Sequence, residues 1–196
     1  MKRYYLPLAA LVLIALVWFA VLGFLRTDKT KFYGDEYRRP AFDFSLTDQR
    51  NQKFILSEHA DKVILLNFGF TNCPDVCPTT LGILGEVLDI VGDERAMALF
   101  VTVDPKRDTA ERLGAYIPFF HDRIVGLTGS EEKIKQVNDA CGTFYSKEQE
   151  ISEEDYLVVH SPAVYLIGPG GAMLLRYPKD KLLPEKMADD VKRLLL

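Results

Sequence analysis

Positive charge is not in excess in this sequence, and it is nowhere concentrated. The 196 residues include 24 lysines and arginines against 28 aspartates and glutamates, for a formal net charge of −4 at pH 7. A nucleic-acid-binding domain usually carries clustered lysines and arginines, and no such run is present. Internal repeats and low-complexity segments are also lacking. We therefore expect no nucleic-acid partner, and one globular domain with an appendage.

Cysteine and histidine are scarce as well, with three residues of each. No cysteine lies near Gly23, so the acceptor that lipoprotein processing requires is missing. Every thiol or imidazole site must therefore be built from a very small set of side chains.

The longest apolar segment covers Leu6 to Leu25 and contains no charged residue. About twenty such residues are enough to cross a hydrocarbon core as an α-helix. A secretory signal has a shorter apolar core and a small-residue cleavage site, which this segment does not offer. We therefore expect residues 1–26 to form an uncleaved N-terminal transmembrane helix. Residues 27–39 would be a polar linker, and residues 40–196 the globular domain.

Basic residues flank the segment on both sides and do not decide its orientation. Lys2 and Arg3 are nearly balanced by Arg26, Lys29 and Lys31. A first apolar segment so close to the N-terminus usually acts as an export anchor, which would place the domain outside the cytoplasm. The N-terminus lacks a long Arg- and Ser-rich presequence, which favours a bacterial inner membrane over a mitochondrial one. We expect a single-pass protein with its domain facing the periplasm.

Beyond the linker, short apolar strands alternate with helical patterns, which predicts a central sheet flanked by helices. The last two strands should form a hairpin across "GPGG". The expected strands are Phe42 to Leu46, Val63 to Phe70, Met97 to Val103, Ala163 to Ile167 and Met173 to Tyr177, and the expected helices are Thr79 to Val91, Ser130 to Tyr145 and Leu183 to Leu196.

The stretch "FGFTNCPDVCPTT" places Cys73 and Cys77 after a buried strand and before a helix, where open α/β sheets hold their ligands. Proline favours the first helical position, so we expect Pro78 to open the helix and Cys77 to cap it. The helix dipole would then lower the pKa of Cys77 below that of a free thiol. Such a pair can form a disulfide, act as a redox couple or bind one metal ion.

His160, in "YLVVHSPAVYLIGPGG", is expected in the turn before the strand at Ala163, where the sheet can bring it against the cysteines. A surface-loop histidine is the alternative. Two thiolates and one imidazole form a soft, low-coordinate set that suits copper, Cu(I) especially. A structural zinc ion would normally need a fourth ligand. His59 and His121 lie in polar contexts and are expected to be solvated.

Three further residues near these motifs have competing interpretations. Cys141 has no partner at a recognisable spacing and is expected to be a buried, inert thiol. Asp75, between the cysteines, either tunes the loop or is a solvated turn residue. Asp104, in "VDPKRDT", ends a buried strand near the same sheet edge, where it either orients the site or caps the following turn.

Four motifs, "FGFTNCPDVCPTTL", "FVTVDPKRDT", "GLTGS" and "VVHSPAVYLIGPGG", occur in the order typical of one family. From about Phe42 onward the chain resembles the Sco/SenC family of copper-binding proteins that assist assembly of cytochrome c oxidase. The resemblance implies a thioredoxin-like α/β fold in which Cys73, Cys77 and His160 bind copper as Cu(I), Cu(II) or both.

The sequence departs from the family pattern at two positions, both in turns. Gly168 stands where the family commonly has aspartate, and Ala110 where proline is common. These changes bear on local geometry rather than on metal binding.

The resemblance also implies a copper metallochaperone, rather than an enzyme, that acts on the copper-containing oxidase subunit and meets other copper chaperones. The alternative is a thiol-disulfide oxidoreductase that uses Cys73 and Cys77 to reduce the copper-ligand cysteines of that subunit. A reductase more typically carries CxxC and has no need of His160, which ranks copper handling first. A separate redox-sensing role ranks third. Phe70, which stands where peroxiredoxins have threonine, argues against a thiol peroxidase.

Overall fold

The structure is a computed structural model that describes residues 13, 17–18, 31–40, 42–148 and 156–196. The chain divides into two compact units, Met1–Phe32 and Tyr33–Leu196. The transmembrane helix expected at Leu6 to Leu25 falls outside the described residues apart from three positions. Among the residues that are described, no helix has the length and apolar character needed to cross a membrane.

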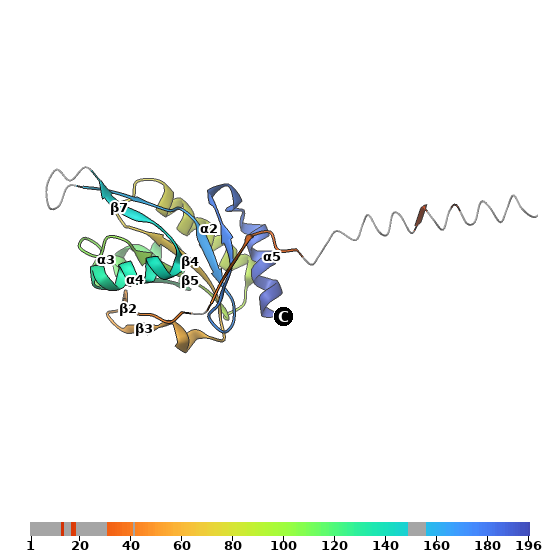
Figure 1. Ribbon diagram of the computed structural model, residues 1–196, viewed down its shortest axis with the longest axis horizontal. Helices are drawn as coiled ribbons and strands as arrows, with labels where there is room; N and C mark the ends of the chain where they lie inside the picture. The colour runs from red at the N-terminus through yellow and green to blue at the C-terminus, as the bar shows by residue number, and fades with distance from the viewer. Residues whose placement is uncertain (1–12, 14–16, 19–30, 41, 149–155) are drawn as a thin grey trace, which may run out of the picture. The chain divides into compact units, whose positions relative to one another are not determined.

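An eight-stranded mixed sheet forms the centre of the second unit (Figure 1), in the order β1-β10-β9-β4-β5-β6-β2-β3. The three strands β4, β5 and β6 run parallel, and the other neighbours pair antiparallel. The strands are β1 (Asp35–Arg39), β2 (Ser45–Asp48), β3 (Lys53–Ile55), β4 (Val63–Gly69), β5 (Ala96–Thr102), β6 (Ile124–Thr128), β9 (Val164–Ile167) and β10 (Met173–Tyr177).

Four helices cover this sheet. They are α2 (Val76–Val91), α3 (Ala110–Tyr116), α4 (Glu131–Cys141) and α5 (Pro184–Leu195). Short 3₁₀ turns occupy Leu56–His59, Ile117–Phe119 and Lys179–Lys181. The helices α2 and α5 pack on each other. Helix α2 also packs against β5, α5 packs against β4, and α3 packs against β6.

The central strands β4 and β5 are buried along their whole length. Parallel strands that are covered on both faces carry continuous apolar sequence, which is why "VILLNFG" and "AMALFVT" identified them. The predicted hairpin is also confirmed, because β9 and β10 pair antiparallel and Gly170 and Gly171 both take positive φ in the turn. The strand predicted at Phe42 to Leu46 lies a few residues later, as β2 at Ser45–Asp48.

The polar segment assigned to the linker contains a strand, which corrects the prediction for residues 27–39. Asp35–Arg39 is the edge strand β1, paired with β10. Its side chains are mostly exposed, although Tyr37 packs on Tyr165 with ring centroids 5.3 Å apart. An edge strand is stabilised by backbone hydrogen bonds to its one neighbour and needs no apolar face. The polar composition of β1 therefore gave no pattern from which a strand could be predicted.

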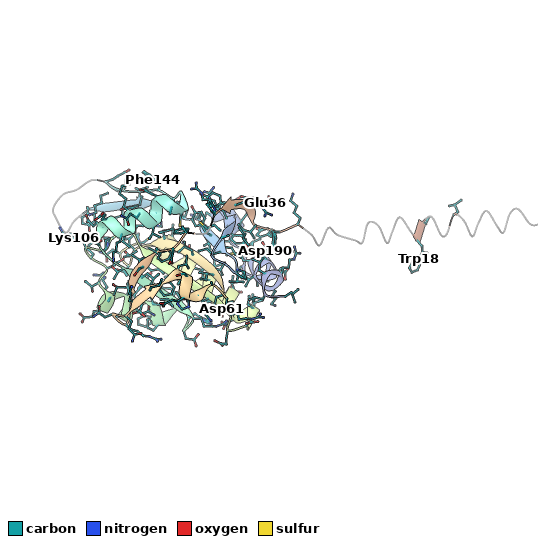
Figure 2. All side chains as sticks on the ribbon, turned by 60° about the horizontal axis from the view of Figure 1, so that its bottom comes forward. Trp18, Glu36, Asp61, Lys106, Phe144 and Asp190 are labelled. Atoms are coloured by element: carbon teal, nitrogen blue, oxygen red, sulfur yellow. The ribbon has the colours of Figure 1, made fainter. Side chains whose placement is uncertain are left out.

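Asp190, which Figure 2 labels, lies on α5 and joins the start of this unit to its last helix. Its carboxylate accepts the backbone N–H groups of Tyr33 and Gly34 at 3.0 and 2.9 Å. It also accepts the hydroxyl of Tyr177 at 3.0 Å. The side chain is 1% exposed, so this is a buried carboxylate satisfied by three donors.

A second, two-stranded sheet consists of β7 (Tyr145–Glu148) and β8 (Leu157–His160), paired antiparallel. We call it the β7–β8 ribbon. The helix predicted through Tyr145 is wrong in its last turn, because α4 ends at Cys141. Gly142 takes a left-handed φ of 62° and its N–H bonds to α4 carbonyls, which ends the helix.

Candidate metal centre

Both cysteines follow the carboxyl end of β4, as predicted. Cys73 lies in the connecting loop, where its N–H donates to the carbonyl of Phe70 at 3.2 Å. Cys77 is the second residue of α2, which begins at Val76 rather than at Pro78. The proline fits in the first turn because the N–H groups there have no partner within the helix. Asp75 is the N-cap residue, exposed and without a side-chain capping bond, which fits the solvated interpretation.

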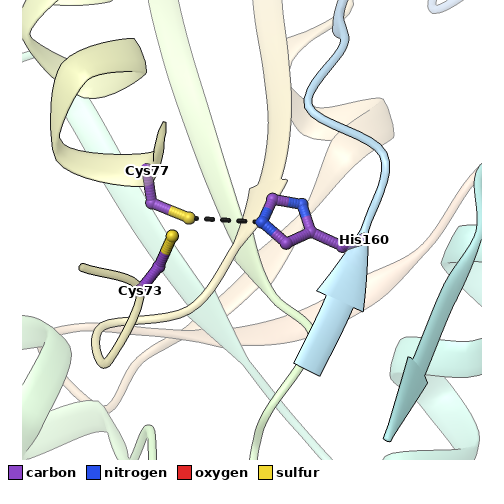
Figure 3. A group of neighbouring side chains, drawn as sticks. All are labelled: Cys73, Cys77 and His160. Carbon is purple, nitrogen blue, oxygen red and sulfur yellow. Dashed lines mark hydrogen bonds between the residues drawn. The ribbon is translucent and has the colours of Figure 1, made fainter. Parts of the chain in front are cut away.

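His160 meets the two cysteines (Figure 3). The sulfur atoms of Cys73 and Cys77 and a ring nitrogen of His160 lie within 4.8 Å of one another. Cys77 Sγ lies 3.4 Å from His160 Nε2. Among the described residues, this is the one group of three or more histidine, cysteine, aspartate or glutamate side chains that could hold a metal ion. All three cysteines of the chain are free thiols.

The imidazole of His160 is oriented by its own backbone neighbourhood. His160 is the last residue of β8, not a turn residue as predicted. Its Nδ1 lies 3.0 Å from the carbonyl of Ser161, which can only accept, so Nδ1 carries the proton and Nε2 is free to face the sulfur atoms. Burial lowers the pKa of His160 below its usual value, which keeps the ring neutral. A neutral imidazole fixed through its far nitrogen is the form that binds metals.

The prediction for the pKa of Cys77 is wrong. Burial raises that pKa well above the value of a free thiol, and the N–H of Phe70 offsets only part of the effect. The side chain is 1% exposed, and loss of water around the thiolate outweighs the helix dipole. The sequence placed the thiol correctly at the helix start but gave no measure of its burial.

Gly69 ends β4 directly beneath the Cys77 sulfur. A Cβ atom at this position would lie 2.8 Å from Cys77 Sγ and 2.6 Å from the ring of Phe100. The sulfur therefore packs against strand backbone, and glycine is required for that approach.

A groove of about 440 Å³ opens beside the site and gives a route to it from outside. Its lining is mainly apolar and includes Phe70, Cys73, Pro74, Val76, Val158 and His160. The edge of the Phe70 ring faces the imidazole, with centroids 5.8 Å apart. A hollow of similar volume between α4 and β7 contains none of the three candidate ligands.

The other predicted residues lie away from the group. Cys141 is buried, as expected, and burial raises its pKa to about 12. His59 is half-buried and stacks on Phe54 at 4.6 Å between centroids. The expectation of a solvated His121 is wrong, since its side chain is 11% exposed and contacts two aspartates.

Sequence reasoning missed the partners of the two aspartates in "VDPKRDT". Asp104 does more than cap a turn, because its carboxylate accepts bonds from Tyr156 and Arg107. Asp108 accepts bonds from the backbone and side chain of Thr71, in the cysteine loop. The motif contained both carboxylates, but their partners come from distant parts of the chain.

Comparison with known proteins identifies the family. The SCO1/SenC family model matches residues 35–196. A bovine mitochondrial SCO2 homolog is 39% identical over 155 residues, which is 77% of this chain and 58% of that protein. An SCO2-like protein of Rickettsia conorii is 36% identical over 148 residues, covering 74% and 72% of the two chains. This chain thus spans little more than half of the bovine relative.

Solved structures agree with these matches. Apo Sco1 of Thermus thermophilus superposes with a TM-score of 0.76 at 37% identity, covering 84% of this chain and 98% of that one. Copper-bound ScoI of Bradyrhizobium japonicum gives a TM-score of 0.73 at 32% identity, covering 80% and 100%. The mixed sheet with its flanking helices is accordingly the thioredoxin-like α/β fold that was predicted. With a matching family model over most of its length and the Cys-Cys-His group assembled at one sheet edge, this chain belongs to the SCO1/SenC family.

Proposed function

We propose that this chain is a copper metallochaperone that carries copper on Cys73, Cys77 and His160 and delivers it to the copper-containing subunit of cytochrome c oxidase. The observation that carries the proposal is the convergence of two sulfur atoms and one imidazole nitrogen within 4.8 Å. Copper is here the cargo of the protein. Relatives of 30–32% identity, from Bradyrhizobium japonicum and yeast among others, have been solved with copper bound.

The donor set favours copper over harder ions. Thiolate sulfur and imidazole nitrogen are soft or borderline ligands, and a three-ligand set suits Cu(I) in particular. The imidazole already presents an unprotonated Nε2 toward Cys77 Sγ. Other copper chaperones would supply the ion, through the groove beside Cys73 and His160.

A thiol-disulfide oxidoreductase is the second candidate. It is favoured by the presence of two free thiols whose sulfur atoms are within 4.8 Å of one another. Such an enzyme would use Cys73 and Cys77 to reduce the cysteines of the oxidase subunit. It would have no use for the oriented nitrogen of His160, so that residue separates the two functions.

We further propose that residues 1–26 anchor the protein in a bacterial inner membrane, with the domain in the periplasm. The apolar length of Leu6 to Leu25 supports this placement. Because the second compact unit begins at Tyr33 and β1 at Asp35, we place the end of the linker before Tyr33.

The deciding experiment replaces His160 by alanine, with His59→Ala as a control that removes a histidine outside the site. A chaperone predicts that His160→Ala lowers copper affinity at least tenfold, a change of about 1.4 kcal/mol, while the thiols still form and break a disulfide. Cells carrying this variant should lose oxidase activity at limiting copper and regain part of it when copper is added. Near-normal oxidase activity at limiting copper would favour the reductase instead.

A further inference from the structure

His160 belongs to β8, a strand that is not part of the eight-stranded sheet. Within the described residues, β8 pairs only with β7, and neither strand joins the eight-stranded sheet. Beyond His160, the carbonyl of Ala163 accepts a hydrogen bond from Asn67 of β4 at 3.4 Å, and the chain then enters β9, which pairs with β4. The main sheet thus fixes the chain beyond the histidine. Besides the pairing with β7, a contact at the start of β8 fixes the strand before it.

That contact is made by Tyr156, directly before β8. Its side chain is 4% exposed, and its hydroxyl donates to Asp104. The guanidinium of Arg107 lies over the ring at 3.9 Å from the centroid, and Arg107 Nη1 donates to the backbone carbonyl of Tyr156 at 3.3 Å. Arg107 also bonds the same carboxylate of Asp104. Tyr156 is therefore held at its hydroxyl, its ring face and its backbone.

Asp104 is itself fixed in the segment between β5 and α3. It is fully buried, and its N–H donates to Thr102 Oγ1 at 2.9 Å. The hydroxyl of Thr102 donates in turn to Asp108 at 2.7 Å. Asp108 then accepts the N–H of Thr71 at 2.9 Å and its hydroxyl at 2.5 Å.

One short segment therefore contacts both halves of the candidate metal centre. Through Asp108 it holds Thr71, two residues before Cys73, and through Asp104 it holds Tyr156, four residues before His160. Four residues of strand span about 13 Å, so one short strand, β8, connects the anchored Tyr156 to His160. A metal site needs its ligands within about 0.5 Å of their productive positions.

We infer that Tyr156, held by Asp104, is a positioning residue that sets where His160 stands relative to the cysteine sulfur atoms. The inference rests on the copper site of the proposed function. Tyr156 does not touch the ion; it acts only through the histidine.

The test is a double-variant comparison on the full chain. Tyr156→Phe keeps the ring beneath Arg107 and removes only the hydroxyl that reaches Asp104. Tyr177→Phe is a matched control, because Tyr177 also donates from a buried hydroxyl to a buried carboxylate, that of Asp190. Copper affinity is measured by competition with a chelator, in the wild-type chain and in His160→Ala. The thiolate-to-copper absorption of the Cu(II) form is recorded for each variant.

Tyr156→Phe should weaken copper binding by about tenfold, as is usual when a residue that orients a ligand is lost. It should also shift the thiolate-to-copper absorption. In the His160→Ala background the same substitution should change neither quantity, because the residue through which it acts is gone. Tyr177→Phe should leave both unchanged in either background.

Two results would overturn the inference: wild-type affinity in Tyr156→Phe, or equal weakening in both backgrounds, which would show a general structural effect. If Tyr156→Phe does not unfold cooperatively, Asp104→Asn carries the test, since an amide offers one acceptor oxygen and leaves either Tyr156 or Arg107 without its partner. Its expected pattern is the same. Unchanged affinity in His160→Ala alone would instead refute the proposed copper site.

Discussion

The sulfur of Cys77 lies 3.4 Å from Nε2 of His160, although 83 positions separate the two residues in the sequence. The contact joins the start of α2, a helix that packs against the main sheet, to the end of β8, a strand of the β7–β8 ribbon. Because neither residue alone distinguishes a redox pair from a metal site, this contact is the geometric basis of the function proposed above.

Replacing either Cys73 or Cys77 by serine should abolish tight copper binding. A hydroxyl is a harder and weaker ligand than a thiolate, so two soft donors would remain at most. Copper per chain, measured after desalting, should fall from one to near zero in both variants. Cys141→Ser should retain full binding, since that thiol is buried away from the group. Wild-type binding by both variants would show that the ligands are misassigned.

Gly69→Ala should destabilise the fold and weaken copper binding together. The added methyl group would overlap Cys77 Sγ and the ring of Phe100, and overpacking of this kind costs about 1–3 kcal/mol. Gly82→Ala is the control, because nothing lies within 4 Å of a Cβ added at that exposed helix position. It should stabilise the chain by about 0.5–1 kcal/mol. Urea unfolding measures the stability of both variants. Equal stabilities of Gly69→Ala and Gly82→Ala would contradict the packing described.

The buried carboxyl of Asp108 should give stability a measurable pH dependence. Burial raises its pKa above the ordinary value of 3.8, despite bonds from Thr71 and Thr102. Above pH 3.8 and up to the raised pKa, the folded state keeps a proton that the unfolded state has lost, so this group's contribution to stability falls as pH rises. The stability difference between wild type and Asp108→Asn should therefore shrink from pH 4 to pH 7.

Asp43 provides the matching control for that experiment. Hydrogen bonds from Ser57 lower its pKa below 3.8, so its contribution is fully present above that value and is lost only as pH falls further. Asp43→Asn should show almost no change in relative stability between pH 4 and pH 7. A slope of equal size for both variants would mean that Asp108 is not the group responsible.

Alkylation should separate the three thiols of the native chain. Cys73 is half-buried beside the groove, whereas Cys77 and Cys141 are each at most 1% exposed. Burial also raises the pKa of both buried thiols, and the protonated form is a poor nucleophile. Iodoacetamide at pH 8 should label Cys73 first, with peptide mass spectrometry as the readout. In denaturant all three should react at similar rates.

A reporter fused after Leu196 tests the anchor at Leu6 to Leu25. An alkaline phosphatase fusion, active only outside the cytoplasm, should be active and should remain with the membrane fraction after a high-salt wash. Replacing two leucines of the segment by lysine should abolish export, at about 3 kcal/mol per charge. A soluble periplasmic product that lacks the segment would show cleavage instead of anchoring.

The parts of the fold that the sequence predicted are those in which one local pattern decides the structure. Continuous apolar runs identified β4 and β5, and "GPGG" identified the β9–β10 turn. Edge strand β1 was missed because its stability comes from backbone pairing with β10, which leaves no apolar periodicity. The ribbon was missed because Gly142 ends α4 in the middle of a helical pattern.

The same division applies to the site. The spacing of Cys73 and Cys77 and the context of His160 were sufficient to name the three side chains that the structure brings together. The pKa of Cys77 could not be predicted in this way, because desolvation depends on how Gly69, Phe100 and the rest of the core surround the sulfur. Tyr156 was missed for a similar reason, since a lone tyrosine carries no local mark of the carboxylate it will meet 52 positions away.

The position of β4 between β5 and β9 also sets an order in time. At about 5–20 residues per second, the ribosome needs roughly 4 to 17 seconds to extend the chain by the 83 positions from Cys77 to His160. During that interval the cysteine loop exists without its histidine, and β4 lacks its neighbour β9. The nascent chain thus carries two unprotected thiols before it has a complete receptor for an ion. Under the proposed function, copper would accordingly be loaded only after β8 and β9 have docked.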